Sequence, residues 1–588
     1  MKTGKNFARI AVTAGLTAVM ALGNVVAPAA MAFAADAGST VTFKDGDYAK
    51  YTTYKGIQIF KAKVTTDGAT TVSNIKWASN DVEAAVVDAI KAKDNSYTSE
   101  NAQDAADWLN EHAKVAGIGP KVASDNVLSL IADNLDGVSG WQTTTAGSPS
   151  LSGLDAGYWL FLTAAVGTPD GSSTDAFTSP VYAVIDGKST TTVTPKKGVP
   201  TVEKKVLDDA DAVASDIKGS DKWKDVADSQ IGQEVNYKLT GTIASNFDTF
   251  STYAYKFTDV LSDGLDFVGG SVEVYALNGG TYSPIDASKY DVAWANNTLT
   301  VDFKVDGIKK GLKDVAGVDA NTQIAVFYKA KLNGSAVIGN AAEGNKGGNP
   351  NTVKLEYSNN PYAEGTGTTI EDTVADFAFK LNLNKVDQGT EKGLAGAVFT
   401  IQSADANTQG KYVASKADDA AGVAAGQLVT VTDASNLPEY VKFTSDNDGK
   451  IAVSGLDAGS YKVAEVKTPD DAYTKANPFT FTITPTYDDA TMKVTGLTAA
   501  VSESDKGRTD IAFGTLDGTA GDHKLTGTEG TGTDAAAGEV TINVGNAKSV
   551  GLPITGLDGV TLTWVAGGAV LVIGVAHLIR SRREESEE

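Results

Sequence analysis

Two ionisable side chains fall on apolar strand faces in the C-terminal third of the chain. Leu381, Leu383 and Lys385 share one face, because side chains alternate with a period of two along a strand. The same period places Glu465 on the face of Tyr461. Burial of an unpaired charge is unfavourable, so we expect the lysine to lose its proton and the glutamate to keep its own.

A neutral lysine amine is a nucleophile, and a protonated carboxyl can polarise a neighbouring amide carbonyl. An asparagine carboxamide beside both groups would be attacked by the amine, releasing ammonia and leaving a Lys–Asn amide. Asn543 and Asn546 are the two candidates on the last predicted strand. Alternation favours Asn546, which shares a face with Val540, Ile542 and Val544.

A second set of polar residues repeats this arrangement in the middle of the chain. In each of three predicted strands, one polar residue shares a face with two apolar or aromatic residues. These are Lys204 with Val202 and Val206, Asp259 with Tyr255 and Phe257, and Asn359 with Leu355 and Tyr357. No comparable trio is found between residues 35 and 196. The sequence therefore predicts buried lysine clusters in two regions.

The C-terminal tail combines a short motif with a membrane-length apolar run. The motif is Leu552-Pro553-Ile554-Thr555-Gly556, and the apolar run from Val560 to Ile579 is followed by arginines. Roughly 20 apolar residues span a bilayer core as a helix. The arginines are expected on the cytoplasmic side, which leaves the rest of the chain outside.

The N-terminus has the pattern of an export signal. Basic residues precede an apolar run from Ile10 to Leu22, and small residues around Phe33 indicate cleavage after Ala34. The alternative is a membrane anchor, for which the apolar run is short.

Composition limits the function classes. The net charge of −23 argues against nucleic-acid binding. There are no cysteines, so a disulfide framework is excluded. The three histidines, His112, His523 and His577, share no motif, which argues against a histidine metal site or a His-dependent triad. Because a chain of 588 residues is too long to fold around a single hydrophobic core, several domains are expected.

Periodicity predicts three β domains in a row. The first contains strands and a helical insertion, with helices beginning at Asn80, where Glu83 would complete a capping box, at Ser99 and near Ser124. The next two domains show only strand patterns separated by turn residues, as in sandwiches. The predicted segments are a signal peptide at 1–34, β domains at 35–196, 197–373 and 374–550, and the tail at 551–588.

The tail resembles the cell-wall sorting signal of Gram-positive surface proteins. That resemblance implies that a sortase cleaves between Thr555 and Gly556 and passes the threonine carbonyl to an amine. Lys385-Val386-Asp387, with Leu394 to Phe399, resembles the opening of a collagen-adhesin B-type domain. Tyr461, Glu465 and Pro469 resemble its glutamate motif, although Val466 and Thr468 depart from it. In the family, the bonded asparagine lies at a usual distance along the chain from the sorting motif. That distance implies Asn543 as a slightly better candidate than Asn546.

The segment from Tyr255 to Leu265 is similar to the isopeptide-forming middle domain of pilin shaft subunits. The similarity implies Lys204 as the amine, Asp259 as the assisting acid and Asn359 as the amide. A slip of one residue in register would substitute Lys205 and Asn360.

Thr194-Pro195-Lys196-Lys197 resembles the Tyr-Pro-Lys-Asn motif of shaft pilins, with different residues on both flanks. The resemblance implies that Lys196 of one subunit attacks the thioester formed through Thr555 of another. Lys197 is the alternative acceptor. The acceptor amine must be accessible to the sortase.

Taken together, the chain resembles the backbone subunit of a sortase-assembled pilus. This implies an all-β fold of tandem immunoglobulin-like sandwiches and no enzymatic turnover, cofactor or metal. The implied partners are pilus-specific and housekeeping sortases, further copies of the chain, minor or tip pilins, and peptidoglycan. The implied location is the extracellular, wall-anchored fimbrium. A monomeric wall-anchored adhesin or minor pilin that binds host matrix or glycan is the alternative.

Overall fold

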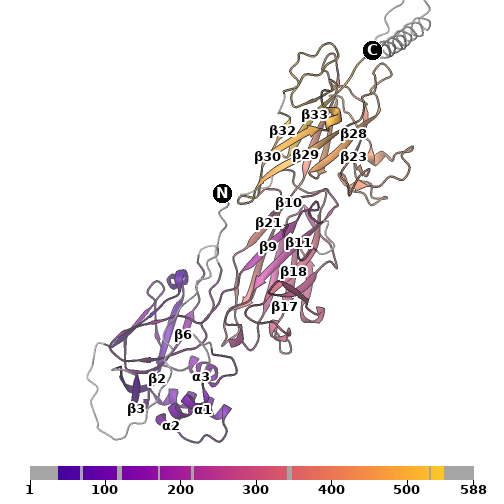
Figure 1. Cartoon of the computed structure of the whole chain (residues 1–588). Helices are drawn as coiled ribbons and strands as arrows, with labels where there is room; N and C mark the ends of the chain where they lie inside the picture. The colour runs from indigo at the N-terminus through magenta and orange to yellow at the C-terminus, as the bar shows by residue number, and fades with distance from the viewer. Residues whose placement is uncertain are drawn as a thin grey trace, which may run out of the picture.

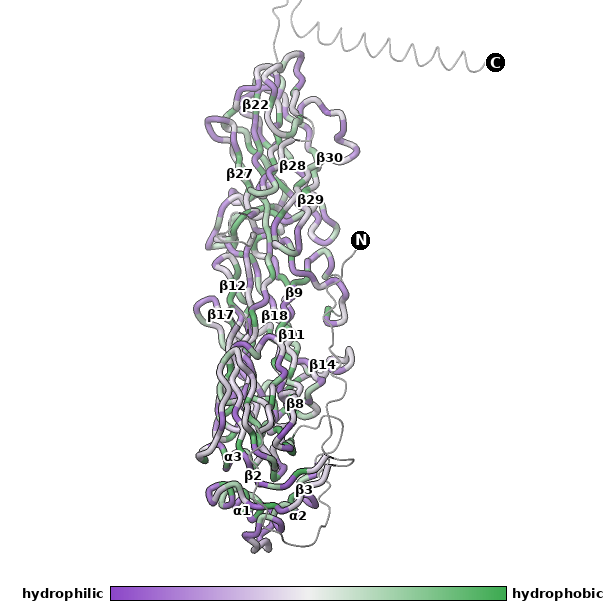
Figure 2. Tube along the Cα trace, turned by 90° about the vertical axis from the view of Figure 1, so that its left-hand side faces the viewer, coloured by the Kyte–Doolittle hydropathy of each residue, from purple (hydrophilic) through white to green (hydrophobic). Residues whose placement is uncertain are grey.

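Three β domains follow one another in an elongated row, which confirms the predicted fold class (Figures 1 and 2). The structure is a computed structural model that describes residues 38–66, 70–114, 122–169, 173–212, 217–340, 347–528 and 531–548. The helices of the first domain lie at one end of the row, and the third domain lies at the other (Figure 2). The predicted signal peptide and sorting tail lie outside the described residues.

The first domain consists of two sheets and a helical insertion. Its strands are β1 (Ser39–Phe43), β2 (Thr53–Thr65), β3 (Thr71–Trp77), β4 (Gln142–Thr143), β5 (Ser150–Leu154), β6 (Gly157–Ala165), β7 (Val181–Ile185) and β8 (Thr190–Val193). One sheet has the order β5-β1-β8, and the other has the order β3-β2-β6-β7 with β4 beside β2. Between β3 and β4 come α1 (Asn80–Lys93), α2 (Ala102–His112) and α3 (Val127–Asp136). The helices share a core with β2 and β6, as the predicted insertion requires.

The helices begin where side chains cap their first N–H groups. Ser79, not an Asn80–Glu83 box, caps α1 by accepting from the Val82 N–H at 3.2 Å. Asn101 and Asn126 cap α2 and α3, so these helices begin slightly later than predicted. An asparagine oxygen at this position satisfies backbone donors that have no partner within the helix.

The second domain is a sandwich of two large sheets. Its strands are β9 (Val202–Leu207), β10 (Val226–Asp228), β11 (Glu234–Thr242), β12 (Tyr255–Leu261), β13 (Leu265–Phe267), β14 (Glu273–Asn278), β15 (Thr281–Pro284), β16 (Asp291–Ala295), β17 (Thr298–Phe303), β18 (Gln323–Leu332), β19 (Asn349–Ser358), β20 (Thr366–Thr368) and β21 (Asp372–Phe377). One sheet has the order β10-β21-β19-β12-β17-β16, and the other has the order β15-β14-β18-β11-β9. Alternating apolar residues from both sheets form one core between them.

The third domain is also a two-sheet sandwich. Its strands are β22 (Phe379–Asp387), β23 (Val398–Ser403), β24 (Tyr412–Val413), β25 (Leu428–Val429), β26 (Phe443–Thr444), β27 (Lys450–Leu456), β28 (Gly459–Lys467), β29 (Phe479–Asp488), β30 (Lys493–Val501), β31 (Ile511–Phe513), β32 (Thr533–Asp534) and β33 (Glu539–Asn546). The orders are β27-β22-β33-β31 and β25-β24-β23-β28-β29-β30. The first strand, β22, pairs in parallel with the last strand, β33.

The second domain extends beyond the boundary proposed at 373/374. That boundary lies inside β21, which pairs with β19 and β10 in the second domain. Only Ala378 separates β21 from β22, so the chain passes from one sandwich to the next almost without a loop. No turn residue marks this point in the sequence, because both strands are buried and read as one apolar pattern.

Candidate functional site

The third domain encloses a lysine, an asparagine and a glutamate in contact. Lys385 on β22 donates from Nζ to Asn546 Oδ1 on β33 at 2.5 Å, and to the Val544 carbonyl at 3.0 Å. Asn546 Nδ2 donates to Glu465 Oε1 on β28 at 2.9 Å. All three side chains are almost fully buried. The sequence prediction that Lys385 and Glu465 point into one core agrees with this placement.

The surroundings favour the neutral form of the lysine. Burial lowers the pKa of Lys385 to about 8, against the opposing attraction of Glu465. Lys385 Nζ lies 4.0 Å from Glu465 Oε1, so the asparagine carboxamide connects the amine and the carboxyl. The Ala476 N–H holds the other glutamate oxygen at 2.6 Å. The electrophile, Asn546, is therefore within hydrogen-bond reach of both the nucleophile and the acid–base group.

Asn546, rather than Asn543, faces the lysine, which corrects the order in which the two were ranked. Asn543 points to the opposite side of β33, where its Nδ2 donates to the carbonyls of Ala512 and Gly514 and its Oδ1 accepts from Asn384. The physical reason is strand alternation, since residues three apart lie on opposite faces. The family's usual spacing between the bonded asparagine and the sorting motif had favoured Asn543, which does not contact Lys385.

The second domain contains a related cluster around Lys204. Lys204 Nζ on β9 donates to both oxygens of Asp259 on β12, at 2.5 and 2.6 Å. Its amine also donates to the Tyr328 hydroxyl at 2.9 Å, and Tyr328 donates to Asp259 at 2.5 Å. Burial lowers the pKa of Lys204 to about 8 and raises the pKa of Asp259. Both groups are thus shifted toward their neutral forms.

The amide beside this pair is Asn351, which the sequence analysis missed. Asn351 Nδ2 donates to the same Tyr328 hydroxyl at 2.6 Å. Its carbonyl oxygen is buried and has no hydrogen-bond partner among the described residues, which is unfavourable for a free carboxamide. Val353 on β19 is the residue paired with Asp259. Asn351 lies two positions before Val353, so its side chain is on the same face of β19 as that of Val353.

The prediction of Asn359 as the partner of Lys204 is wrong. Asn359 is eight residues from Asn351, about 26 Å along an extended strand, and its Nδ2 donates to the Asp175 carbonyl at 3.3 Å. The alternatives also fail: Lys205 pairs with Asp225 at 2.5 Å, and Asn360 Oδ1 accepts from the Tyr362 N–H. The signal that could have located Asn351 is the same alternation, continued from Leu355 back through Val353 toward the start of β19.

Lys196 and Lys197 differ sharply although they are adjacent between β8 and β9. Lys196 is half-buried, with its backbone held by Thr178 and Ser179, and its amine has no hydrogen-bond or ion-pair partner in the described part of the chain. Lys197 contacts the carboxylates of Asp45 and Asp175, and its side chain is 7% exposed. This placement contradicts Lys197 as an accessible acceptor.

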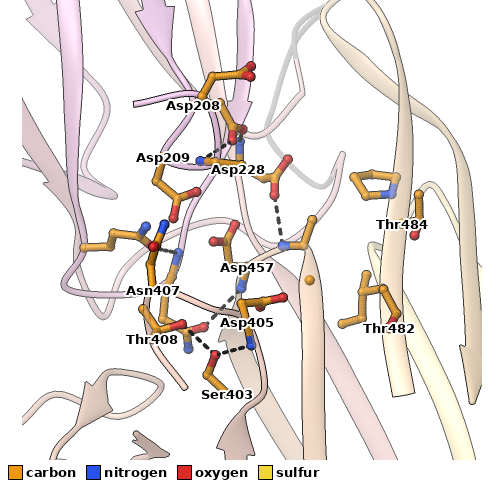
Figure 3. Close-up of a pocket in the computed structure, with 18 of the residues that line it drawn as sticks. Asp208, Asp209, Asp228, Ser403, Asp405, Asn407, Thr408, Asp457, Thr482 and Thr484 are labelled. Carbon is orange, nitrogen blue, oxygen red and sulfur yellow. Dashed lines mark hydrogen bonds between the residues drawn. The ribbon is translucent and has the colours of Figure 1, made fainter. Parts of the chain in front are cut away.

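A hollow between the second and third domains is lined by aspartates (Figure 3). Asp208, Asp209 and Asp228 come from the second domain, and Asp457 from the third. Asp228 links the domains by accepting from the Ala458 N–H at 2.9 Å. Burial, followed by repulsion from Asp228, raises the pKa of Asp208 to about 7.

Within the ranges that the structure describes, no group of three or more His, Cys, Asp or Glu residues could hold a metal ion. No helix within those ranges is long and apolar enough to cross a membrane. The predicted cleavage sites at Ala34 and at Thr555, within Leu552 to Gly556, lie outside them.

Two family models match the chain over its sandwich domains. Residues 231–361 match the Gram-positive pilin backbone subunit 2, Cna-B-like domain, and residues 379–497 match the SpaA prealbumin-like fold domain. The chain therefore carries the domains of a Gram-positive backbone pilin. These proteins are structural subunits of the pilus shaft, and this pilin is accordingly a surface protein that assembles with other pilin copies.

Individual relatives of the pilin are distant in sequence. The trypsin-resistant surface T6 protein of Streptococcus pyogenes serotype M6 is 24% identical over 412 residues, covering 60% of this chain and 68% of the relative. The solved T6 backbone pilin of the same organism has a TM-score of 0.48 at 15% identity, covering 88% of this chain and all of that one. The full-length major pilin SpaD of Corynebacterium diphtheriae has a TM-score of 0.43 at 17% identity, covering 87% of this chain and 98% of SpaD.

Proposed function

We propose that this pilin is polymerised by a sortase that joins Thr555 of one subunit to Lys196 of the next. The support is the contrast between neighbouring lysines: the amine of Lys196 has no partner among the residues that the structure describes, while the amine of Lys197 is engaged inside the first domain. A sortase-bound acyl group needs an amine that can leave its local contacts to reach it. By the same chemistry, a sortase would transfer the last subunit to peptidoglycan. Minor or tip pilins would be further partners.

The experiment compares two matched variants in cells that make the pilus. Lys196→Arg keeps the charge but removes the nucleophile, and we expect it to abolish the high-mass ladder on denaturing gels. Lys197→Arg should leave the ladder intact. A ladder that persists in Lys196→Arg and disappears in Lys197→Arg would reverse the assignment. A ladder that persists in both, and in the double variant, would favour the monomeric adhesin.

We also propose that both sandwiches close on an internal amide, Lys385–Asn546 and Lys204–Asn351. In each case Nζ attacks the asparagine carboxamide carbon, the bond from that carbon to Nδ2 breaks, and ammonia leaves. Glu465 or Asp259 carries the proton from the amine to the departing nitrogen. The contact of 2.5 Å between Lys385 Nζ and Asn546 Oδ1 is the observation that carries this proposal.

Each bond occurs once per chain, so the pilin performs no turnover and acts as the substrate of another enzyme. Intact mass of the mature chain tests it, because each Lys–Asn bond removes about 17 Da as ammonia. The expected result is a branched peptide for each pair. Linear peptides with free Lys385 and Lys204 from folded protein would contradict it.

A further inference from the structure

A third buried lysine cluster lies in the first domain, where the sequence shows no comparable trio. Lys197 Nζ contacts Asp175, and it donates to Asp45 Oδ2 at 2.6 Å. The side chains of Lys197, Asp45 and Asp175 are 7%, 9% and 0% exposed. Tyr54 lies 3.4 Å from the same amine and donates to Asp45.

The charges of this cluster do not balance if every group is ionised. Two carboxylates face one ammonium, which leaves one negative charge in a site with almost no water. Such a site holds a proton in preference to an unpaired charge. Burial raises the pKa of Asp45, and repulsion by Asp175 adds to the effect, whereas Lys197 and Tyr54 oppose it. A carboxyl group next to a buried amine is the arrangement that the other two domains build with Glu465 and Asp259.

The Asp175 carboxyl is held as an electrophile. The Thr52 hydroxyl donates to its Oδ2 at 2.6 Å, and the Ala176 N–H donates to its Oδ1 at 2.8 Å. Thr52 is itself oriented by the Gly167 N–H at 3.1 Å. Fixed donors on both oxygens stabilise the negative charge that develops there when a nucleophile adds to the carbon. Asp175 therefore occupies the place that a carboxamide takes in the other two clusters.

We propose that Lys197 and Asp175 form a third internal amide, with Asp45 as the proton carrier. Nζ of Lys197 adds to Cγ of the Asp175 carboxyl, and the bond from Cγ to one carboxyl oxygen breaks. Nζ gives up two protons in all, Asp45 relays them to the departing oxygen, and that oxygen leaves as water. No oxidant or further reactant is needed. Condensation is unfavourable in bulk water, but here it replaces buried charges by a neutral amide and expels the water. The fixed contact also removes the entropy cost of encounter.

The bond would fasten the connector to the second domain. Lys197 immediately precedes the chain that enters β9, and Asp175 lies 22 residues earlier in a segment that contacts the second domain. In that segment the Thr174 N–H donates to the Thr368 carbonyl at 2.8 Å, and the Phe177 N–H donates to the Asn359 carbonyl at 2.7 Å. A covalent tie here would keep the first and second domains in register next to Lys196.

The experiment is peptide mapping of the full mature pilin by mass spectrometry. We expect a branched peptide that joins Lys197 to Asp175 and weighs about 18 Da less than its two components, the mass of one water. Asp175→Asn supplies a sharp control, because loss of ammonia from that variant leaves the same amide. Its branched peptide should therefore have the same mass as that of the wild type.

Two further variants separate the bond from the ion pairs. Lys197→Arg keeps a cation between the aspartates but should give only linear peptides. Asp45→Asn keeps the volume and removes the proton carrier, and it should lower the branched fraction by at least tenfold. Linear peptides with an unmodified Lys197 from folded wild-type protein would overturn the proposal. The same digest reports Lys385 and Lys204 separately, so failure here is distinct from failure of the other bonds.

Discussion

Lys385 Nζ and Asn546 Oδ1 lie 2.5 Å apart, on the first and last strands of the third sandwich. Because β22 and β33 run in parallel as neighbours, a bond between these two residues would close nearly the whole domain into a loop. Force applied to the ends of such a domain is carried by the bond before it reaches the rest of the sheet.

Asn546→Ala should prevent the third-domain bond, whereas Asn543→Ala should not. Relative to the mass calculated from its own sequence, the first variant should lack the loss of about 17 Da that the third-domain bond causes. The bond would close a sequence separation of 161 residues, so its loss should lower the unfolding free energy by about 5 kcal/mol on the loop-entropy estimate. Mass spectrometry and urea unfolding test both effects. Equal mass loss in the two variants would contradict the assignment.

The unbonded third domain should become more stable as the pH rises from about 8 to 10.5. In Asn546→Ala the Lys385 amine is free, and burial lowers its pKa from 10.5 to about 8. The unfolded chain then binds more protons than the folded chain in this window, so stability rises with pH there. Urea midpoints of Asn546→Ala should therefore rise relative to the double variant that also carries Lys385→Met. Parallel pH profiles would show that Lys385 does not titrate in this range.

In the second domain, Asn351→Ala should abolish the bond and Asn359→Ala should preserve it. Asn351 shares the Tyr328 hydroxyl with Lys204, whereas Asn359 faces the first domain. Peptide mapping distinguishes the two variants, and trypsin resistance of the folded protein should fall only in Asn351→Ala. A branched peptide at Asn359 would restore the assignment that the sequence suggested.

The aspartates between the second and third domains should make this junction weaker as the pH rises. Burial and neighbouring aspartates raise the pKa of Asp208 from 3.8 to about 7, so the folded state binds the extra proton between these values. Stability then falls as the pH rises through that window. Asp208→Asn should raise Tm at pH 7 to 8 and have little effect near pH 4. An equal shift at both pH values would rule out titration of Asp208 as the cause.

The sequence by itself placed Lys385 and Lys204 in the cores of their domains. Period-two alternation placed Lys385, Glu465, Lys204 and Asp259 on core faces, and all four are buried. Such patterns are local, because the side-chain direction of a residue depends only on its own strand. The same alternation had also favoured Asn546, and the distance taken from the family overrode it.

Only the tertiary structure decided which residues meet. Lys204 reaches Asp259 and lies near Asn351 because two separate sheets pack face to face, and no periodicity within one strand specifies that register. Lys197, Asp45 and Asp175 lie outside the strands, in segments with no alternation to read. Their meeting follows from the packing of loops around the first domain's connector, and this is why sequence reasoning found two clusters where the fold forms three.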